Sequence, residues 1–150
     1  MRPALFLDRD GVINVDHGYV GRKEDFEFIP WIFNACLLAQ QLGYLIFVVT
    51  NQSGIGRGYY TEQAFLELND WMVGVFKEHG IDIAKVYYCT SLYSSDRKPE
   101  PGMIIRAAKE FDVDLANSIL VGDNETDVQA GIAAGVGVNL LIYGGNHGIF

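Results

Sequence analysis

Five short apolar segments alternate with helix-like segments along the chain. The apolar segments are rich in β-branched and aromatic residues and have the length of buried strands; they span residues 4–7, 44–49, 84–89, 118–121 and 136–142. The segments between them carry apolar residues at helical spacing or begin with helix-capping residues; they span residues 30–43, 61–79, 103–111 and 124–134. This alternation predicts an α/β fold, a doubly wound and mainly parallel sheet of Rossmann-like type with helices on both faces.

The length of the chain and the lack of a linker predict one domain, residues 1–150. A chain of 150 residues can bury about two-thirds of its unfolded surface. Single strand-helix units fill the gaps between the motifs described below, so we expect no inserted cap domain. We expect the glycine-rich end of the chain, residues 144–150, to be poorly ordered.

The composition excludes several kinds of partner. The formal net charge is -8, whereas proteins that bind nucleic acid generally neutralise phosphates with Lys and Arg. No apolar run approaches the roughly 20 residues that cross a bilayer, and the segment after Leu7 is too polar for a signal-peptide core. We therefore expect a cytoplasmic protein that binds neither nucleic acid nor a membrane. The two cysteines form no disulfide pattern, and Cys36 is expected in the core.

Polar residues follow four of the predicted strands, where each strand ends. They are Asp8, Asp10, Thr50, Lys98, Asp123 and Asp127. In an open parallel sheet the carboxyl ends of the strands lie on one edge, where ligands bind. An Asp-x-Asp-Gly sequence alone is as often a turn or a helix cap as a site. The four strand ends together favour a site.

The chemistry of this set points to phosphoryl transfer. Three carboxylates repel one another unless a cation lies among them, and an all-oxygen site with space for water and phosphate suits Mg²⁺. A hydroxyl, backbone N–H groups and a lysine complement the negative charge that spreads over a phosphoryl group in its transition state. A carboxylate such as Asp8 can then attack the phosphorus.

Over almost its whole length, the sequence resembles the haloacid dehalogenase superfamily. Within the superfamily it is similar to the heptose bisphosphate phosphatases and shares several motifs with histidinol phosphatases. The motifs that carry the resemblance are residues 7–20, 50–58, 97–99 with 102–103, and 121–123. The resemblance implies a haloacid dehalogenase-type phosphatase that removes the 7-phosphate of D-glycero-D-manno-heptose 1,7-bisphosphate, in nucleotide-heptose and surface polysaccharide synthesis.

The resemblance also implies catalytic roles for individual residues. Asp8 is the nucleophile that becomes an aspartyl phosphate, and Asp10 acts as a general acid and then as a general base. Thr50 and the N–H of Asn51 hold the phosphate. Lys98 neutralises charge on Asp8 and on the phosphoryl oxygens.

A metal site and a substrate site follow from the same resemblance. Mg²⁺ is held by Asp8, the backbone carbonyl of Asp10 and Asp123, while Asp127 orients the loop that carries Asp123. The candidates for binding the substrate's sugar or its other phosphate are Asp16, Gly18, Tyr19, Asn51, Gln52, Ser53, Arg57 and Arg97. Of these, the two arginines are the candidates for bidentate recognition of phosphate.

The sequence departs from the family where related enzymes hold a structural zinc ion. Cys89 matches the first zinc ligand, but Ser91 stands where a histidine would be, and 94–96 contains no cysteine pair. A single cysteine does not make a four-ligand site, so we expect no zinc. From the resemblance we also expect the additional C-terminal strand and helix of the family to be missing, and we expect an open pocket on a monomer or weak homo-oligomer.

Three alternatives remain open from the sequence. The substrate can be another small phosphate ester, such as a heptose monophosphate or histidinol phosphate. A phosphoacceptor receiver domain also combines an Asp cluster, a Thr, a Lys and Mg²⁺, but its acceptor Asp follows the third strand, where this chain has Cys89. A non-catalytic sugar-phosphate binder is disfavoured because both Asp8 and Asp10 are present.

Overall fold

The computed structural model describes residues 1–143, and within that range five strands form a parallel sheet. The strands are β1 (Ala4–Leu7), β2 (Leu45–Asn51), β3 (Lys85–Cys89), β4 (Ile119–Gly122) and β5 (Val138–Leu141). Their order across the sheet is β3-β2-β1-β4-β5, and every neighbouring pair is parallel. The predicted α/β class and the parallel sheet are confirmed.

The chain reverses its direction of winding at β1. It first builds outward from β1 to β2 and β3, and then returns to place β4 against the opposite edge of β1. In doubly wound sheets a crevice opens at such a reversal, outside the carboxyl ends of the strands. The end of β1 is where Asp8 and Asp10 follow in the sequence.

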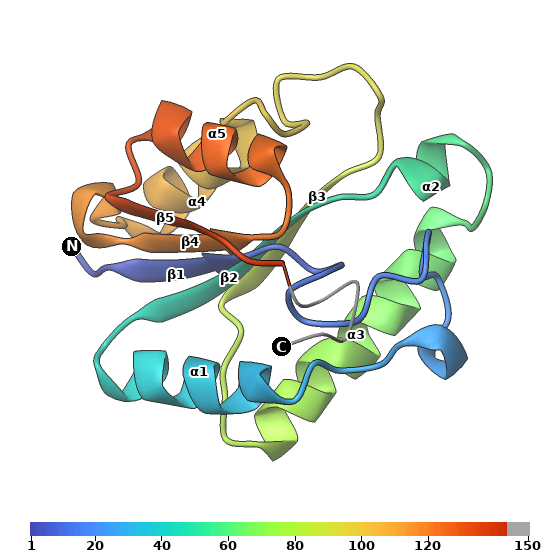
Figure 1. Ribbon diagram of the computed structural model, residues 1–150, viewed down its shortest axis with the longest axis horizontal. Helices are drawn as coiled ribbons and strands as arrows, with labels where there is room; N and C mark the ends of the chain where they lie inside the picture. The colour runs from blue at the N-terminus through green and yellow to red at the C-terminus, as the bar shows by residue number, and fades with distance from the viewer. Residues whose placement is uncertain (144–150) are drawn as a thin grey trace.

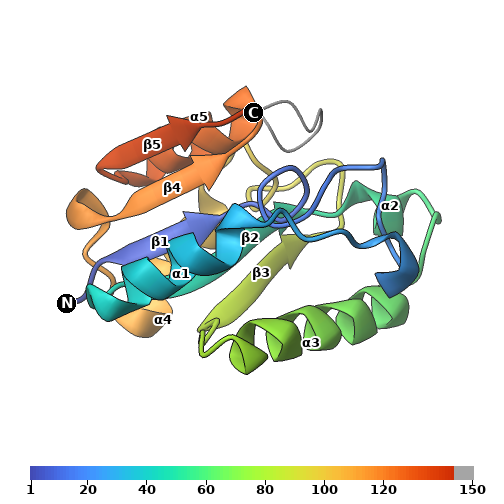
Figure 2. The ribbon, with the colours of Figure 1, turned by 60° about the horizontal axis from the view of Figure 1, so that its bottom comes forward.

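Helices cover both faces of the sheet, as Figures 1 and 2 show. The helices are α1 (Trp31–Gln41), α2 (Ser53–Gly56), α3 (Glu62–Glu78), α4 (Gly102–Phe111) and α5 (Glu125–Ala134). In Figure 1, α4 and α5 lie above the sheet while α1 and α3 lie below it. Short 3₁₀ turns occupy Lys23–Asp25 and Leu115–Asn117.

The alternation of side chains along β1 supplies both layers of the core. Leu5 and Leu7 belong to the apolar cluster on the side of α1 and α3, whereas Ala4 and Phe6 belong to the cluster on the side of α4 and α5. All four residues are buried, because a central strand has a helix layer on each face. Cys36 lies in the first cluster, so its predicted core position is confirmed.

The structure corrects two element boundaries in the segment that follows the second apolar run. β2 continues through Thr50 and Asn51, because these residues remain paired with Tyr88 and Cys89 of β3. The glycine-rich segment predicted as a loop contains the short helix α2, in which the N–H of Arg57 donates to the carbonyl oxygen of Ser53 over 2.9 Å.

The other predicted boundaries agree with the structure within about two residues, and Thr61 caps α3 by accepting from the N–H of Ala64. The prediction for residues 144–150 falls outside the described part of the chain. Within residues 1–143, no helix combines the length and apolar character that crossing a membrane requires.

Candidate active site

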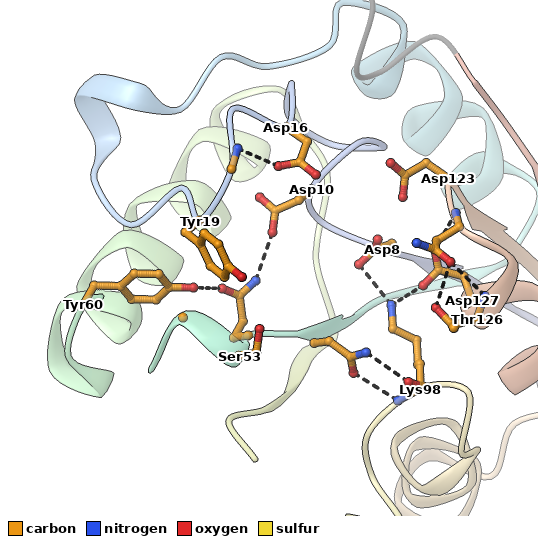
Figure 3. A pocket seen from close by; sticks show the side chains of 15 residues that line it. Asp8, Asp10, Asp16, Tyr19, Ser53, Tyr60, Lys98, Asp123, Thr126 and Asp127 are labelled. Atoms are coloured by element: carbon orange, nitrogen blue, oxygen red, sulfur yellow. Dashed lines mark hydrogen bonds and ion pairs between the residues drawn. The ribbon is translucent and has the colours of Figure 1, made fainter. Parts of the chain in front are cut away.

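A cleft of about 330 Å³ opens at the carboxyl ends of the central strands. Asp8 follows β1, Asn51 ends β2, and Asp123 follows β4, while Lys98 comes from the long connection between β3 and α4. The residues that line the cleft are Asp8, Asp10, Asp16, Gly18, Tyr19, Asn51, Gln52, Ser53, Gly54, Tyr60, Lys98, Asp123, Asn124, Thr126 and Asp127. Figure 3 shows the acidic residues and Lys98 converging on this space.

Lys98 is the buried cation of the cleft. Its side chain is 3% exposed, and its ammonium donates to Oδ1 of Asp8 over 3.0 Å, to the carbonyl oxygen of Val49 over 2.9 Å, and to Oδ1 of Asp127. Three acceptors satisfy the three donors of an ammonium group. The amide of Asn51 fixes the backbone of Lys98, accepting from its N–H over 3.0 Å and donating to its carbonyl oxygen over 3.2 Å.

Asp8 lies where negative charge is concentrated. Burial raises the pKa of Asp8 to about 8; the charge of Lys98 opposes this rise, and the carboxylates of Asp127, Asp10 and Asp123 add to it. One oxygen from each of Asp8, Asp123 and Asp127 lies within 4.8 Å of the others. Oxygen donors at this spacing, with charge that Lys98 alone does not balance, fit a hard divalent cation such as Mg²⁺.

Two glycines allow the acidic residues to approach one another. A Cβ atom on Gly11 would lie 1.9 Å from Oδ2 of Asp123, and a Cβ on Gly122 would lie 2.3 Å from the Cβ of Asp127. Gly11 also has φ +91°, a conformation that side-chain-bearing residues rarely adopt. Any larger residue at position 11 would displace Asp123 from the cleft.

Asp127 uses both of its carboxylate oxygens inside the protein. Oδ1 accepts from Lys98, and Oδ2 accepts from the N–H of Asn124 over 3.1 Å in the capping box that begins α5. Asp127 therefore ties the loop that carries Asp123 to the buried lysine.

Asp10 is held from three directions. The guanidinium of Arg9 donates to both of its oxygens over 3.0–3.2 Å, the amide of Asn14 donates to Oδ1 over 3.0 Å, and the amide of Gln52 donates to Oδ2 over 3.2 Å. Arg9 is 2% exposed, and its Nη2 also donates to the carbonyl oxygen of Val20. The Asp10 side chain is therefore fixed in orientation although it lines an open cleft.

The loop opposite the acidic residues forms the outer wall of the cleft. Oδ1 of Asp16 accepts from the N–H of Gly18 over 2.9 Å, which closes a small turn. Tyr19 has φ 52°, and its ring meets the ring of Tyr59 edge to face with centroids 4.6 Å apart. A bulky residue in this conformation marks a constrained segment.

The structure does not bring every predicted residue to the surface of the cleft. Thr50 is buried behind it, where its hydroxyl accepts from the amide of Gln52 over 2.9 Å. Arg57 is exposed at the end of α2, and neither Arg57 nor Arg97 is among the lining residues. Arg97 is half-buried, and its Nη1 is buried without a hydrogen-bond partner.

The sequence analysis missed six residues that build the site: Arg9, Asn14, Gly54, Tyr60, Asn124 and Thr126. A basic residue between two aspartates, next to a buried strand, is a usable signal that Arg9 pairs with one of them. The capping-box pattern of Asn124 and Asp127 is likewise readable. Tyr60 stands in a loop without periodicity, and no local pattern identifies it.

The comparisons with known proteins agree with this geometry. Residues 95–148 match a family model described as HAD-hydrolase-like. A D-glycero-alpha-D-manno-heptose-1,7-bisphosphate 7-phosphatase of Burkholderia mallei is 54% identical, with 93% of this chain and 79% of the relative covered. A D-glycero-beta-D-manno-heptose-1,7-bisphosphate 7-phosphatase of Vibrio cholerae is 46% identical, with 94% and 81% covered.

A solved structure shows the same arrangement. The D,D-heptose 1,7-bisphosphate phosphatase from B. bronchiseptica, complexed with magnesium and phosphate, has a TM-score of 0.84 and 31% sequence identity, and the match covers 91% of this chain and 78% of that one. The parallel sheet and its acidic rim thus have the form of the haloacid dehalogenase-type hydrolases. Within that superfamily, the chain belongs to the family of the heptose-1,7-bisphosphate 7-phosphatases.

Proposed function

We propose that this chain is an Mg²⁺-dependent phosphomonoesterase that removes the 7-phosphate of D-glycero-D-manno-heptose 1,7-bisphosphate, in nucleotide-heptose and surface polysaccharide synthesis. One observation carries the proposal: Asp8 contacts the buried ammonium of Lys98, while the neighbouring Asp10 is clamped at the same cleft. A nucleophile beside a proton donor and a fixed cation is what phosphate ester hydrolysis through a covalent intermediate requires. Relatives that bear the name of this activity support the substrate.

In the first step, a carboxylate oxygen of Asp8 attacks the phosphorus, and the bond from phosphorus to the sugar oxygen breaks. Asp10 in its protonated form donates its proton to the departing sugar oxygen. Lys98 balances the charge on Asp8 and on the phosphoryl oxygens, and the N–H of Asn51 holds those oxygens. For Thr50 to hold them as well, its hydroxyl, which donates to the carbonyl oxygen of Asn51 over 3.4 Å, would have to turn toward the cleft. The products of this step are the sugar alcohol and an aspartyl phosphate on Asp8.

In the second step, Asp10 takes a proton from a water molecule whose oxygen attacks the phosphorus. The bond between phosphorus and Asp8 breaks, inorganic phosphate leaves, and Asp10 is protonated again for the next cycle. The clamp of Arg9, Asn14 and Gln52 supports this double role, because it keeps the Asp10 carboxyl in one orientation through both steps.

Asp8, the backbone carbonyl of Asp10 and Asp123 would hold the Mg²⁺ ion. When bound, the ion supplies positive charge that lets an anionic carboxylate approach an anionic phosphate. The raised pKa of Asp8 and the spacing of the acidic oxygens support a cation here. The contacts of Asp127 to Lys98 and Asn124 support its role in orienting the loop rather than in catalysis.

We further propose one catalytic domain, residues 1–150, which acts without zinc as a monomer or weak homo-oligomer. The thiol of Cys89 is buried and donates to the carbonyl oxygen of Ser91 over 3.6 Å, an arrangement that supports a structural role within the loop. The wall at Asp16, Gly18 and Tyr19, together with Asn51, Gln52, Ser53 and Arg97, is the proposed substrate site. Arg57 is exposed outside the lining of the cleft and is not included.

Phosphate release tests the proposed function. The purified chain with Mg²⁺ is given both anomers of the 1,7-bisphosphate, the heptose 7-phosphate and histidinol phosphate. We expect the bisphosphates to be hydrolysed fastest, with loss of activity in EDTA and in Asp8→Asn. Release from histidinol phosphate alone would favour the alternative substrate, and no release from any compound would contradict the proposal.

A further inference from the structure

The side-chain amide of Gln52 connects two parts of the proposed active site. Its Nε2 donates to Oδ2 of Asp10 over 3.2 Å and to the hydroxyl of Thr50 over 2.9 Å. Gln52 is 2% exposed; its hydrogen bond to Thr50 is buried, and its hydrogen bond to Asp10 is partly buried at the cleft. The amide thus contacts the residue proposed as proton donor and a residue proposed to hold the phosphate.

The hydroxyl of Tyr60 completes this connection. It donates to Oε1 of Gln52, which satisfies the carbonyl end of the amide while the amino end faces Asp10 and Thr50. Asp10 and Tyr60 therefore contact different ends of this amide. An amide that turned over would present its oxygen to the Asp10 carboxylate, and two acceptors repel each other.

Two glycines from separate segments shape the slot that holds the Tyr60 ring. A Cβ atom on Gly54 would lie 2.4 Å from Cε1 of Tyr60, and a Cβ on Gly21 would lie 2.8 Å from its Cδ1. A residue larger than glycine at position 21 or 54 would therefore clash with the Tyr60 ring. Burial raises the pKa of Tyr60, and the charge of Arg9 opposes this rise.

We propose that Tyr60 is a positioning residue that acts through Gln52. By fixing the amide, Tyr60 directs the Asp10 carboxyl toward the leaving sugar oxygen. This inference rests on the proposed phosphatase function and extends it to a residue that does not touch the reacting atoms.

The test compares leaving groups. A sugar alkoxide needs a proton as it departs, whereas p-nitrophenolate leaves with little assistance, so misplacement of Asp10 slows only the first reaction strongly. For Tyr60→Phe we expect kcat/KM on the heptose bisphosphate to fall about tenfold, the scale of one buried hydrogen bond, and kcat/KM on p-nitrophenyl phosphate to fall about threefold at most. An equal loss on both substrates would mean a merely structural role and would overturn the inference.

A double-mutant comparison tests the route through Gln52. Gln52→Ala removes the amide. Adding Tyr60→Phe to this variant is therefore expected to leave the ratio of kcat/KM on the heptose bisphosphate to kcat/KM on p-nitrophenyl phosphate unchanged. A further tenfold loss there would show that Tyr60 acts by another route. Tyr88→Phe is the matched control, because it also removes a tyrosine hydroxyl that donates to a side chain, Glu62, at the exposed edge of the sheet.

The two proposals fail in different ways. If the unmodified chain releases phosphate from no substrate, the proposed function fails. If the unmodified chain is active and Tyr60→Phe has the same ratio of kcat/KM on the two substrates as the unmodified chain, only the role of Tyr60 fails.

Discussion

The ammonium nitrogen of Lys98 lies 3.0 Å from Oδ1 of Asp8, a residue 90 positions earlier in the chain. The same nitrogen contacts Asp127, so one buried cation joins the loop that follows β1 to the first turn of α5. These contacts depend on the complete fold, because Asp8 and Lys98 come from different strand-to-helix connections and Asp127 comes from a helix. It also makes Lys98 the residue whose loss affects both stability and chemistry.

Lys98→Met is expected to lower both stability and activity. The substitution leaves the carboxylates of Asp8 and Asp127 facing each other and removes a donor from the carbonyl oxygen of Val49. Removal of one partner from a buried ion pair costs about 3–5 kcal/mol, and we expect this loss in urea unfolding without metal. Phosphate release should fall below a hundredth of the original rate. Lys85→Met is the control, since Lys85 forms an exposed ion pair with Glu110.

Asp8→Asn is expected to abolish turnover and yet stabilise the metal-free protein above neutral pH. The pKa of Asp8 rises from 3.8 to about 8 in the folded protein. Between these values the folded protein retains a proton that the unfolded chain has lost, so the original protein loses stability as pH rises from about 4 to about 8. Asp8→Asn has no ionisable group at this position, so its stability does not fall in this way. Thermal unfolding in EDTA at pH 5 and pH 8 compares the variant with the original protein. If the two proteins differ in unfolding temperature by the same amount at both pH values, the raised pKa of Asp8 is contradicted.

Gly11→Ala is expected to weaken binding of Mg²⁺. The added methyl group would lie 1.9 Å from Oδ2 of Asp123 and must displace this side chain. Gly43→Ala is the matched control: Gly43 has the same φ of +91° but no atom near its Cβ position. Both variants carry a backbone cost of about 1 kcal/mol, whereas only Gly11→Ala should raise the Mg²⁺ concentration needed for half-maximal activity, by about tenfold or more. Equal Mg²⁺ requirements would place the ion away from Asp123.

Arg9→Lys is expected to slow turnover while the charge is preserved. Lysine cannot reproduce the two-pronged contact of the guanidinium with Asp10. We expect kcat to fall about tenfold and the free energy of unfolding to fall by about 1–3 kcal/mol. Arg22→Lys, at an exposed pair with Asp25, should change neither quantity measurably. Normal kinetics in Arg9→Lys would show that Asp10 needs no clamp.

Arg97 and Arg57 are expected to differ in their effect on substrate binding. Arg97 precedes Lys98 and has a buried guanidinium nitrogen without a partner, which an anionic group of the substrate would satisfy. Neither arginine lines the cleft, but Arg57 is exposed whereas Arg97 is half-buried. We expect Arg97→Ala to raise KM for the bisphosphate about tenfold and Arg57→Ala to change it less than about twofold. A larger rise in KM for Arg57→Ala than for Arg97→Ala would place the second phosphate of the substrate near Arg57, at the end of α2.

The fold was predictable because each strand is long enough, and apolar enough, to be read by itself. β1 and β4 are continuous apolar runs because both of their faces are covered by helices, and this pattern identifies a parallel sheet. The boundaries of β2 were less readable. Thr50 and Asn51 extend the strand only because β3 lies beside them, a long-range contact that no local pattern contains.

The acidic and basic residues of the site were predictable because they follow strand ends. The topology then brings Asp8, Lys98 and Asp123 to one rim. The contacts that hold these residues were not predictable, since the Gln52 amide and the Tyr60 hydroxyl meet through the turn around α2. Arg57 and Arg97 were predicted from their motifs, but neither lines the cleft. A sequence motif does not say whether a long side chain faces the cleft.

Trapping the covalent intermediate tests the central claim most directly. The chain is mixed with heptose 1,7-bisphosphate and Mg²⁺, quenched in acid within the first turnover, and analysed by mass spectrometry of its peptides. We predict one phosphoryl group on the peptide that contains Asp8, and its absence in Asp8→Asn. Rapid phosphate release with no phosphoryl group on Asp8, or with the group on another residue, would contradict the account.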